Sequence, residues 1–397
     1  MTELTESLGK RLSPLILPRF RGIGVLVETP DGAVHRLDNH DPENVHAITI
    51  KKWSFFYDLL VGYDLGFAES YINEKWECTN LPDLFKHLSK SSPDNAISRL
   101  SKYFPKKIKS RIWQRVRSSN TIKWAKRNIE EHYDLSNEFF SSFLDPSMTY
   151  SSGIYDSPDE DLSVAQNRKL ETLLENSAIN EGDQILDIGC GWGSLVFKAA
   201  SEYNCGVAGV TLSRNQYKYT SSLLKNHKLS NKTKIMLMDY REIENKFDHI
   251  FSIEMLEAVG HKGINEFFKK CAQILNKNGT IQVQVITIPD EHYDSYRKNC
   301  DFIQKYIFPG GMLPSLGIIQ KSAQENGFEI LKMRSLGSDY VKTLRAWRNN
   351  LYSNRQNWKD IGFDNSDYRK FEYYFSYCEG GFDSGHIDNY QISFKRP

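Results

Sequence analysis

The stretch Asp183–Ala200, "DQILDIGCGWGSLVFKAA", decides the fold of this chain. An apolar run ends at three alternating glycines, Gly189, Gly191 and Gly193, and an apolar helical run follows them. Glycine lets the chain turn tightly and lets a ligand approach the backbone, while the start of the next helix offers free N–H groups. The stretch therefore predicts a strand, a ligand-binding turn and a helix.

The same alternation continues beyond this stretch. Further β-like runs are "GVAGVTL", "TKIMLMD", "FDHIFSI" and "TIQVQVITI", each separated from the next by a helical run. Strands alternating with helices predict an α/β fold with a doubly wound, mostly parallel sheet covered on both faces. A last run, "HIDNYQISFKR", follows a helical stretch and predicts a final strand, whose order and direction in the sheet stay open.

The region before this alternation has a different pattern. From about residue 22 to residue 90, short strands such as "GIGVLVETPDGAVHRL" and "HAITI" precede helical runs, which predicts a small α+β unit. Residues 93–130 follow with a helical pattern. We therefore expect an N-terminal domain at 1–92, a basic helical linker at 93–130 and a catalytic domain at 131–397.

Composition limits the class of protein. The 397 residues are 40% hydrophobic and 25% charged, as in ordinary folded proteins, so disorder is excluded. No apolar run is long enough to span a bilayer, and the N-terminal apolar patch is too short for a signal peptide, which predicts a cytoplasmic protein. The six cysteines form no CxxC pair or Cys/His cluster, so we expect neither a disulfide framework nor a metal site.

The glycine turn alone leaves a dinucleotide-binding enzyme, a methyltransferase and a structural turn open. A dinucleotide site usually has an acid about 20 residues beyond the glycines, but the next strand ends in "GVTLSRNQ", with Thr211 and Gln216. The third strand is followed by Asp239, which is suited either to an exocyclic amine such as that of adenine or to capping a helix. The GxGxG spacing is common in methyltransferases that use S-adenosylmethionine, and we therefore favour S-adenosylmethionine over NAD.

Several motifs make a more specific resemblance. "HYDLSNEFFSSFLDPSMTYSSGIY", "LDIGCGWGSL", "GVTLSRNQ", "EMLEAVG", "DFIQKYIFPGGMLPS" and "YYFSYCEGGF" occur in this order from His132 onward, and "GYDLGFAESYINEKWE" precedes them. In these segments the chain resembles the cyclopropane-fatty-acyl-phospholipid synthase family. The resemblance implies a class I methyltransferase (Rossmann-like) fold, preceded by a small lipid-binding domain. It also implies transfer of a methylene group from S-adenosylmethionine to the cis double bond of an acyl chain in a membrane phospholipid.

The resemblance also implies a cofactor site. Residues expected to bind S-adenosylmethionine are Tyr150, Ser151, Asp187, Gly189, Gly191, Gly193, Thr211, Leu212, Gln216 and Asp239.

Methylene transfer to a double bond needs side chains that stabilise a cation, and it needs a base. Attack of the alkene on the sulfonium methyl group leaves a cation, which aromatic faces stabilise. Aromatic residues in the motif segments are Tyr133, Tyr150, Phe308, Tyr373, Tyr374 and Tyr377, although these side chains also suit a core or an acyl tunnel. By resemblance the base is a bicarbonate, oriented by Ser152, Glu257, Gln284, the backbone of Ile286, and Tyr340.

The sequence departs from the best-known members of that family at three places. Ser152 stands where they have cysteine, Gln284 where they have histidine, and Glu257-Ala258 where they have a Glu-His pair. Serine and glutamine still donate hydrogen bonds, so an anion site is retained. The product stays open between a cyclopropane and a methylene, methyl-branched or furan-precursor chain. A non-catalytic lipid-binding protein with a degenerate methyltransferase fold is the alternative of another class.

A basic segment separates the two regions of a chain that is otherwise nearly neutral, with 51 basic and 50 acidic residues. It has no acid between residues 95 and 129. We expect five of its basic residues to hold the protein on the inner face of an anionic membrane, namely Lys106, Lys107, Lys109, Arg111 and Arg115. Phe308 and Tyr374 are expected to contact the lipid as well. A solvated linker is the second interpretation, and nucleic acid is a distant third, so no nucleic acid is expected. A homodimer stays open.

Overall fold

A computed structural model describes residues 2–20, 25–37, 46–90 and 135–396. The predicted basic contacts Lys106, Lys107, Lys109, Arg111 and Arg115, and the aromatic Tyr133, lie outside these residues. The described chain forms two compact units. The first contains the residues up to 90 together with 300–302 and 351–386, and the second contains 135–299, 303–350 and 387–396.

The second unit is built on a seven-stranded sheet in the order β10-β11-β9-β8-β5-β6-β7. All neighbouring pairs are parallel except those of β11, which runs antiparallel to both β9 and β10. The strands are β5 (Gln184–Ile188), β6 (Gly206–Thr211), β7 (Thr233–Leu237), β8 (Phe247–Ile253), β9 (Leu275–Thr287), β10 (Glu329–Ser335) and β11 (Asp388–Lys395). This confirms the predicted α/β fold and its class I methyltransferase topology. The final strand is antiparallel and is inserted inside the sheet rather than at its edge.

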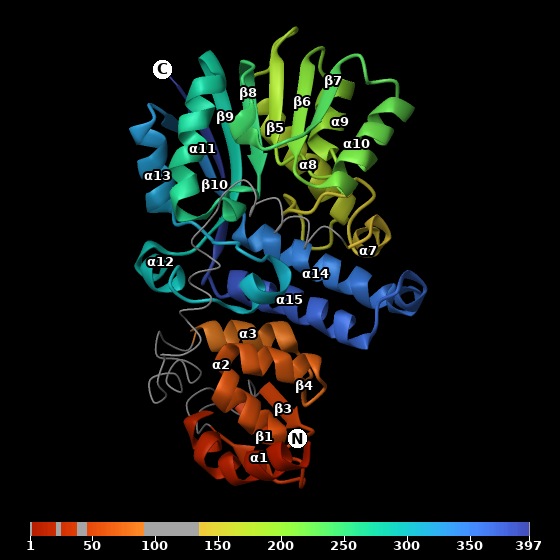
Figure 1. Cartoon of the computed structure of the whole chain (residues 1–397), viewed down its shortest axis with the longest axis vertical. Helices are drawn as coiled ribbons and strands as arrows, with labels where there is room; N and C mark the ends of the chain where they lie inside the picture. Colours follow the sequence, from red (N-terminus) through yellow and green to blue (C-terminus); the bar gives the residue numbers. More distant parts are fainter. Residues whose placement is uncertain (1, 21–24, 38–45, 91–134, 397) are drawn as a thin grey trace. The chain divides into compact units, whose positions relative to one another are not determined.

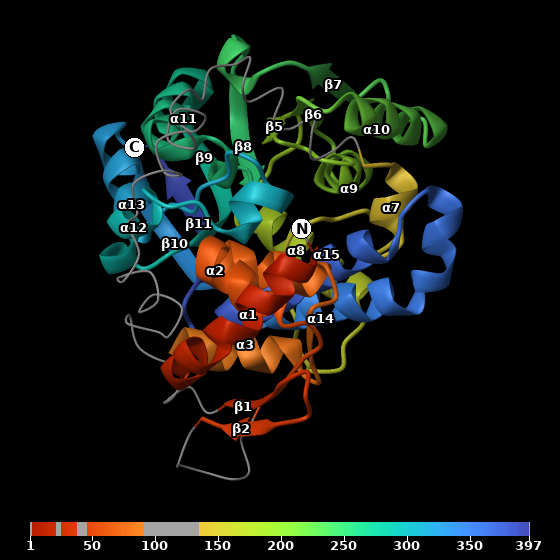
Figure 2. The same cartoon turned by 60° about the horizontal axis from the view of Figure 1, so that its bottom comes forward.

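Helices cover both faces of this sheet (Figures 1 and 2). The helices of this unit are α7 (Asn137–Ser141), α8 (Leu162–Glu175), α9 (Ser194–Glu202), α10 (Arg214–Asn226), α11 (Gly260–Ile274), α12 (Asp290–Tyr296), α13 (Leu316–Glu325) and α14 (Gly337–Ser353), whose last turn belongs to the first unit. Short helical turns are η3 (Tyr240–Glu242), η4 (Leu256–Ala258) and the π-helical η5 (Ile303–Ile307).

Consecutive strand residues serve opposite cores, because side chains alternate across a sheet. Ile185 packs with α8 and α9, whereas Leu186 joins the other core with α11 and α13. Both side chains are fully buried. A strand that is buried on both faces has apolar residues at nearly every position rather than at every second one. The sequence of β5, "QILDI", has this pattern.

The first unit carries a four-stranded sheet in the order β2-β1-β3-β4. Its elements are α1 (Thr2–Ile16), η1 (Leu17–Phe20), β1 (Val25–Glu28), β2 (Val34–Arg36), β3 (His46–Ile50), α2 (Ser54–Ile72), β4 (Trp76–Cys78), α3 (Leu81–Lys90), η6 (Arg355–Ile361) and α15 (Asn365–Asp383). The buried Trp76 ring packs on Phe67 with centroids 4.2 Å apart, and its indole N–H donates to the Phe67 carbonyl.

Helix α15 belongs to this first unit, although the predicted catalytic domain 131–397 includes it. The buried Arg369 donates from Nε to the carbonyl of Tyr71 at 2.6 Å and from a terminal nitrogen to that of Trp76 at 3.1 Å. At Gly380 a Cβ atom would lie 2.6 Å from the backbone nitrogen of Lys86, so only glycine lets α15 approach α3 this closely. The boundary of the compact units therefore follows packing rather than chain order.

Candidate active site

The glycine turn after β5 has the backbone that the sequence predicted. Gly189, Gly191 and Gly193 have φ values of +83°, +53° and +87°, in the region that favours glycine. A Cβ at Gly189 would lie 2.8 Å from Met255 Cγ, and one at Gly193 would lie 2.3 Å from Thr220 Cγ2. A Cβ at Gly191 would meet nothing within 4 Å, so the space beside this backbone is open to a ligand.

The next strand brings its predicted residues to the same edge of the sheet. Because β5 and β6 are parallel and Ile188 pairs with Val210, the turn after β5 lies beside Thr211. Thr211 Oγ1 donates to Gln216 Oε1 at 2.7 Å, and Ser213 caps α10 by accepting from the backbone nitrogen of Gln216. Leu212 between them is partly exposed. These contacts hold Thr211 and Gln216 in place.

Asp239 has the capping role in this structure. Its carboxylate accepts from the backbone nitrogen of Arg241, and it accepts from two guanidinium nitrogens of the same arginine, each at 2.8 Å. Glu242 completes a capping box for η3. A hydrogen bond from Asp239 to an adenine amine stays a prediction.

A buried cation and a buried acid lie below the turn. The Lys169 ammonium is fully buried and donates to Ser151 Oγ at 2.6 Å. Burial lowers the pKa of Lys169 to about 8, opposed by the charges of Glu254, Asp145 and Asp187. Burial raises the pKa of Asp187 to about 7, opposed by Lys169. Asp187 Oδ1 finds no donor among the residues that the structure describes, which leaves it available to a cationic ligand.

An aromatic cluster surrounds Tyr150, the residue before Ser151. The Tyr150 ring packs with Trp347 at 5.2 Å, with Phe140 at 5.5 Å and with Phe308 at 6.1 Å between centroids. Tyr340 meets the same tryptophan edge-on at 6.0 Å. The structure thus brings the predicted Tyr150 and Phe308 together. Tyr373, Tyr374 and Tyr377 lie on α15 in the first unit, where Tyr374 packs on Phe371 and Phe375.

The residues predicted to hold an anion surround a carboxylate of the chain itself. Glu254 Oε1 accepts from the backbone nitrogen of Ser152 at 3.0 Å, from Gln284 Nε2 at 2.8 Å and from Asn389 Nδ2 at 2.6 Å. Glu254 Oε2 accepts from the Tyr340 hydroxyl at 2.6 Å. The sequence analysis missed Glu254 and Asn389, although Glu254 begins the motif "EMLEAVG" from which Glu257 was taken.

Glu257 is a second carboxyl next to this group. Its Oε1 accepts from the backbone nitrogen of Ile286 at 2.6 Å, whereas its Oε2 is buried and has no donor within the described chain. Burial, and then the charge of Glu254, raise the pKa of Glu257 to about 8. At neutral pH Glu257 is therefore mostly in its neutral form.

Gln284 and Ser152 are oriented by further contacts. Gln284 Nε2 also donates to the Ser152 carbonyl at 3.2 Å, and Gln284 Oε1 accepts from Gln391 on β11 at 3.0 Å. The Ser152 hydroxyl donates to the Gly153 carbonyl at 3.0 Å, so it is the backbone of Ser152, and not its side chain, that contacts Glu254.

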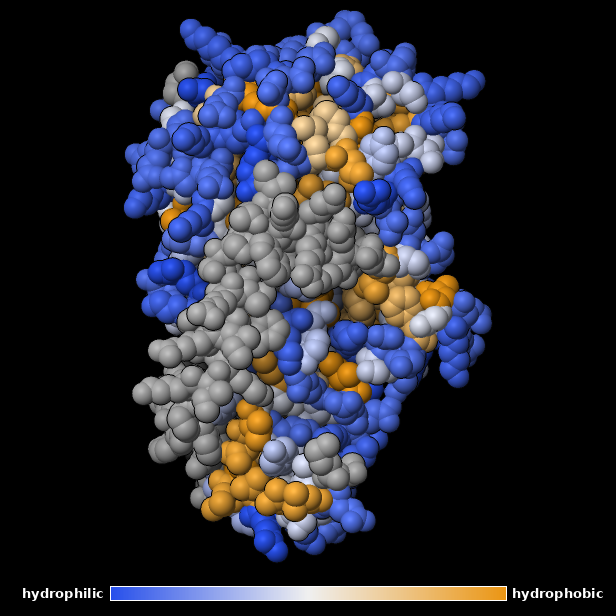
Figure 3. All heavy atoms as spheres, viewed as in Figure 1, coloured by the Kyte–Doolittle hydropathy of each residue, from blue (hydrophilic) through white to orange (hydrophobic). Residues whose placement is uncertain are grey.

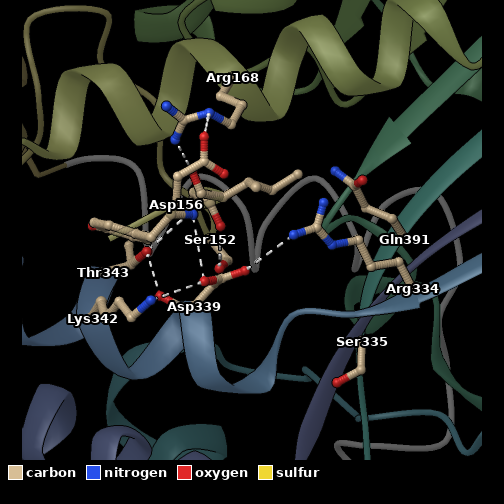
Figure 4. A network of polar contacts seen from close by, with 12 residues as sticks. Ser152, Asp156, Arg168, Arg334, Ser335, Asp339, Lys342, Thr343 and Gln391 are labelled. Atoms are coloured by element: carbon tan, nitrogen blue, oxygen red, sulfur yellow. Dashed lines mark hydrogen bonds and ion pairs between the residues drawn. The ribbon is translucent and has the colours of Figure 1, made fainter. Parts of the chain in front are cut away.

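A polar network fixes the segment that carries Ser152 against α14 (Figure 4). The backbone nitrogen of Gly153 donates to Thr343 Oγ1 at 3.1 Å, and Asp339 forms ion pairs with Lys342 at 3.5 Å and with Arg334 at 4.0 Å. Arg168 of α8 holds Asp156 at 3.0 Å at the far end of the segment. Since Tyr340 lies on the same helix as Asp339, the network sets the position of Ser152 relative to Tyr340.

Fold and site together define a class I S-adenosylmethionine-dependent methyltransferase, and the open space at Gly191 with the unpaired Asp187 oxygen fits this ligand. The chain belongs to the mycolic acid cyclopropane synthetase family, whose model matches residues 120–392. This confirms the family resemblance found in the sequence.

Relatives support the assignment over most of the chain. Tuberculostearic acid methyltransferase UfaA1 from Mycobacterium tuberculosis is 35% identical over 340 residues, which cover 84% of this chain and 79% of that protein. The cyclopropane-fatty-acyl-phospholipid synthase of Escherichia coli is 34% identical over 352 residues, 88% of this chain and 87% of that protein.

Solved structures agree with this fold. Mycolic acid cyclopropane synthase CmaA1, complexed with SAH and CTAB, has a TM-score of 0.64 and 31% identity, covering 68% of this chain and 98% of that chain. Coclaurine N-methyltransferase has a TM-score of 0.63 at 18% identity, covering 83% of this chain and 98% of that chain, which supports the fold alone.

Replacing Gly191 with valine should abolish binding of S-adenosylmethionine. The new side chain would enter the open space beside the turn and block close approach to the backbone. Titration calorimetry measures the loss. Gly182→Val is the matched control, because Gly182 has φ +86° and equally open space but precedes β5 at the opposite end of that strand. Equal binding by the wild type and Gly191→Val would contradict the site.

Replacing Glu257 with glutamine should stabilise the protein at alkaline pH. The pKa of Glu257 is raised from 4.5 to about 8, so its stabilising contribution is fully present below about pH 4.5 and is lost as the pH rises toward 8. Glutamine is neutral throughout. The melting temperature of Glu257→Gln minus that of the wild type should therefore increase between about pH 5 and about pH 8. Glu325→Gln, at an exposed acid, is the control, and a difference that does not change with pH would refute the burial argument.

Proposed function

We propose that the protein transfers a methylene group from S-adenosylmethionine to the cis double bond of an unsaturated acyl chain in a membrane phospholipid, giving a cyclopropane. Membership of the family supports methyl or methylene transfer to acyl chains in general. The observation that carries the proposal is the Glu254–Glu257 pair beside an aromatic cluster, at the strand ends where the cofactor turn lies.

This arrangement supplies what the reaction needs. An alkene is a weak nucleophile, so it must be aligned with the methyl donor in a site that excludes water. The rings of Tyr150, Phe308 and Trp347 offer faces to the cation that forms. A base must then remove a proton from the added methyl group, and carboxyl groups are the nearest candidates.

Bicarbonate as that base stays a prediction, and the residues do not fit it well. The backbone N–H of Ser152, Gln284 Nε2 and the Tyr340 hydroxyl, which were expected to hold the anion, all donate to Glu254. The backbone N–H of Ile286 donates to Glu257. A bicarbonate would have to displace the side-chain carboxyl groups from these donors.

The identity of the product is a separate question from the transfer itself. Two relatives with nearly equal identity are named for different products, one for tuberculostearic acid and one for a cyclopropane fatty acyl phospholipid. A methylene, methyl-branched or furan-precursor chain is therefore the alternative outcome of the same first step.

A membrane substrate also requires a surface that binds lipid. Besides the basic segment in the sequence, the described residues include a row of exposed leucines on α1, namely Leu4, Leu8 and Leu15, at 65%, 37% and 65% exposure. Spacings of four and seven place them along one side of the helix. Figure 3 shows a hydrophobic patch at the bottom of the view. Figure 1, drawn from the same side, shows α1 of the first unit at this place. No helix of the described residues is long and apolar enough to cross a membrane.

Expression in a host that lacks such an enzyme should add one CH₂ to unsaturated phospholipid acyl chains, with loss of alkene reactivity. Mass spectrometry of the extracted lipids measures both. A gain of CH₂ with the double bond retained would replace the cyclopropane by a methylene product. Lipids without any gain would contradict acyl-chain transfer, and Gly191→Val in the same host serves as the inactive control.

Reversing the charge of Lys106, Lys107 and Arg111 to glutamate should weaken binding to anionic vesicles. Each basic residue near an anionic surface contributes about 1 kcal/mol, so a triple reversal should remove more than about 3 kcal/mol and leave binding nearly independent of salt. Sedimentation with anionic and neutral vesicles measures this. Reversal of the exposed Lys225, Lys228 and Lys234 is the matched control. Unchanged sedimentation of the first variant would favour a solvated linker.

A further inference from the structure

We propose that the Glu254 carboxylate is the base that removes a proton from the newly added methyl group, in place of a bound bicarbonate. The proposal rests on the proposed function and assigns a residue to its last step. Its basis is geometric, because donors from four separate segments meet on the two oxygens of this side chain.

The donors orient the Glu254 carboxylate. Glu254 is half-buried, and its Oε1 accepts three hydrogen bonds whereas its Oε2 accepts one. Oε2 therefore has the spare acceptor capacity, and it lies beside Tyr340, whose ring meets the aromatic cluster at Trp347.

The neighbouring acid does not compete for this role. Glu257 is held by the Ile286 nitrogen, and its buried Oε2 has no donor in the described chain, which favours its neutral form. A neutral acid cannot take the proton. The charge of Glu254 also acts on the buried Lys169, whose pKa it raises against the effect of burial.

The backbone at this position is strained. Glu254 has φ +50°, a conformation that favours glycine and that other residues adopt at a cost in free energy. Its nitrogen donates to the Gln284 carbonyl at 2.7 Å, which fixes the turn. The next residue, Met255, packs against the cofactor turn at Gly189, so the strained turn and the cofactor turn are direct neighbours.

The step balances without any further reactant. The alkene carbon that accepts the methyl group leaves its neighbour as a cation, and the donor leaves as S-adenosylhomocysteine. Glu254 takes a proton from the new methyl group, and the electron pair of that C–H bond forms the bond to the cationic carbon. The ring closes, and the neutral Glu254 returns its proton to water.

Two variants test this assignment. Glu254→Gln keeps the size of the side chain but removes the base, and turnover should fall by about 10²–10⁴-fold while calorimetry finds S-adenosylmethionine binding unchanged. Glu254→Gly relieves the strained backbone and frees the Ser152, Gln284, Tyr340 and Asn389 donors. It should fold, lose turnover in degassed buffer and regain part of it when bicarbonate is added. Wild-type turnover should not respond to bicarbonate.

The outcomes separate the two proposals. A wild type that adds no CH₂ to acyl chains defeats the proposed function, whatever the variants do. A wild type that is active but stimulated by bicarbonate, or a Glu254→Gln variant as active as the wild type, overturns the assignment of Glu254 alone. The product pattern is a further readout, because an unquenched cation should rearrange to unsaturated methyl isomers in Glu254→Gln. Glu325→Gln, the same change at an exposed acid, should match the wild type.

Discussion

A half-buried carboxylate bound by donors from distant segments is the constraint on which the catalytic unit depends. The loop at Ser152, strand β9 at Gln284, helix α14 at Tyr340 and strand β11 at Asn389 must all reach Glu254. Removal of one donor would leave this half-buried carboxylate with one hydrogen bond fewer, which destabilises the unit. This requirement also gives the inserted β11 a role, because its pairing with β9 places Asn389 and Gln391 beside Ile286 and Gln284.

The order of elements could be predicted from sequence, but the pairing of the last strand could not. Alternating apolar and helical runs predict βαβ units because parallel strands need crossovers. The position of β11 between β9 and β10 depends on contacts such as Ser393 with Gln282, more than a hundred residues apart in the chain. Likewise, no local pattern assigns α15 to the first unit. Its Arg369 and Gly380 are explained only by contacts with the distant helices α2 and α3.

The candidate site, too, was predicted from the sequence in part. The motifs led to Ser152, Gln284, Ile286 and Tyr340, and the structure brings these four together. What the sequence could not give is the residue at their centre. Glu254 and Glu257 are three positions apart, and only the left-handed turn at Glu254 directs one carboxylate to the four donors while the other meets the Ile286 nitrogen. Asn389 was missed because it belongs to a strand whose place in the sheet was unknown.

A base that is part of the chain has a physical advantage over a captured anion. A dissolved anion must be bound at its ambient concentration, whereas a side chain fixed next to the reacting carbon acts at a high effective concentration. The cost is visible in this structure as a strained backbone at Glu254 and a second acid, Glu257, whose ionised form is disfavoured by burial. A site that drew its base from solution would not need a carboxylate in a strained turn among these four donors, whereas the family resemblance places an acid at Glu257 in such sites as well. The position of Glu254 beside the cofactor turn is therefore better explained by a protein-borne base than by packing alone.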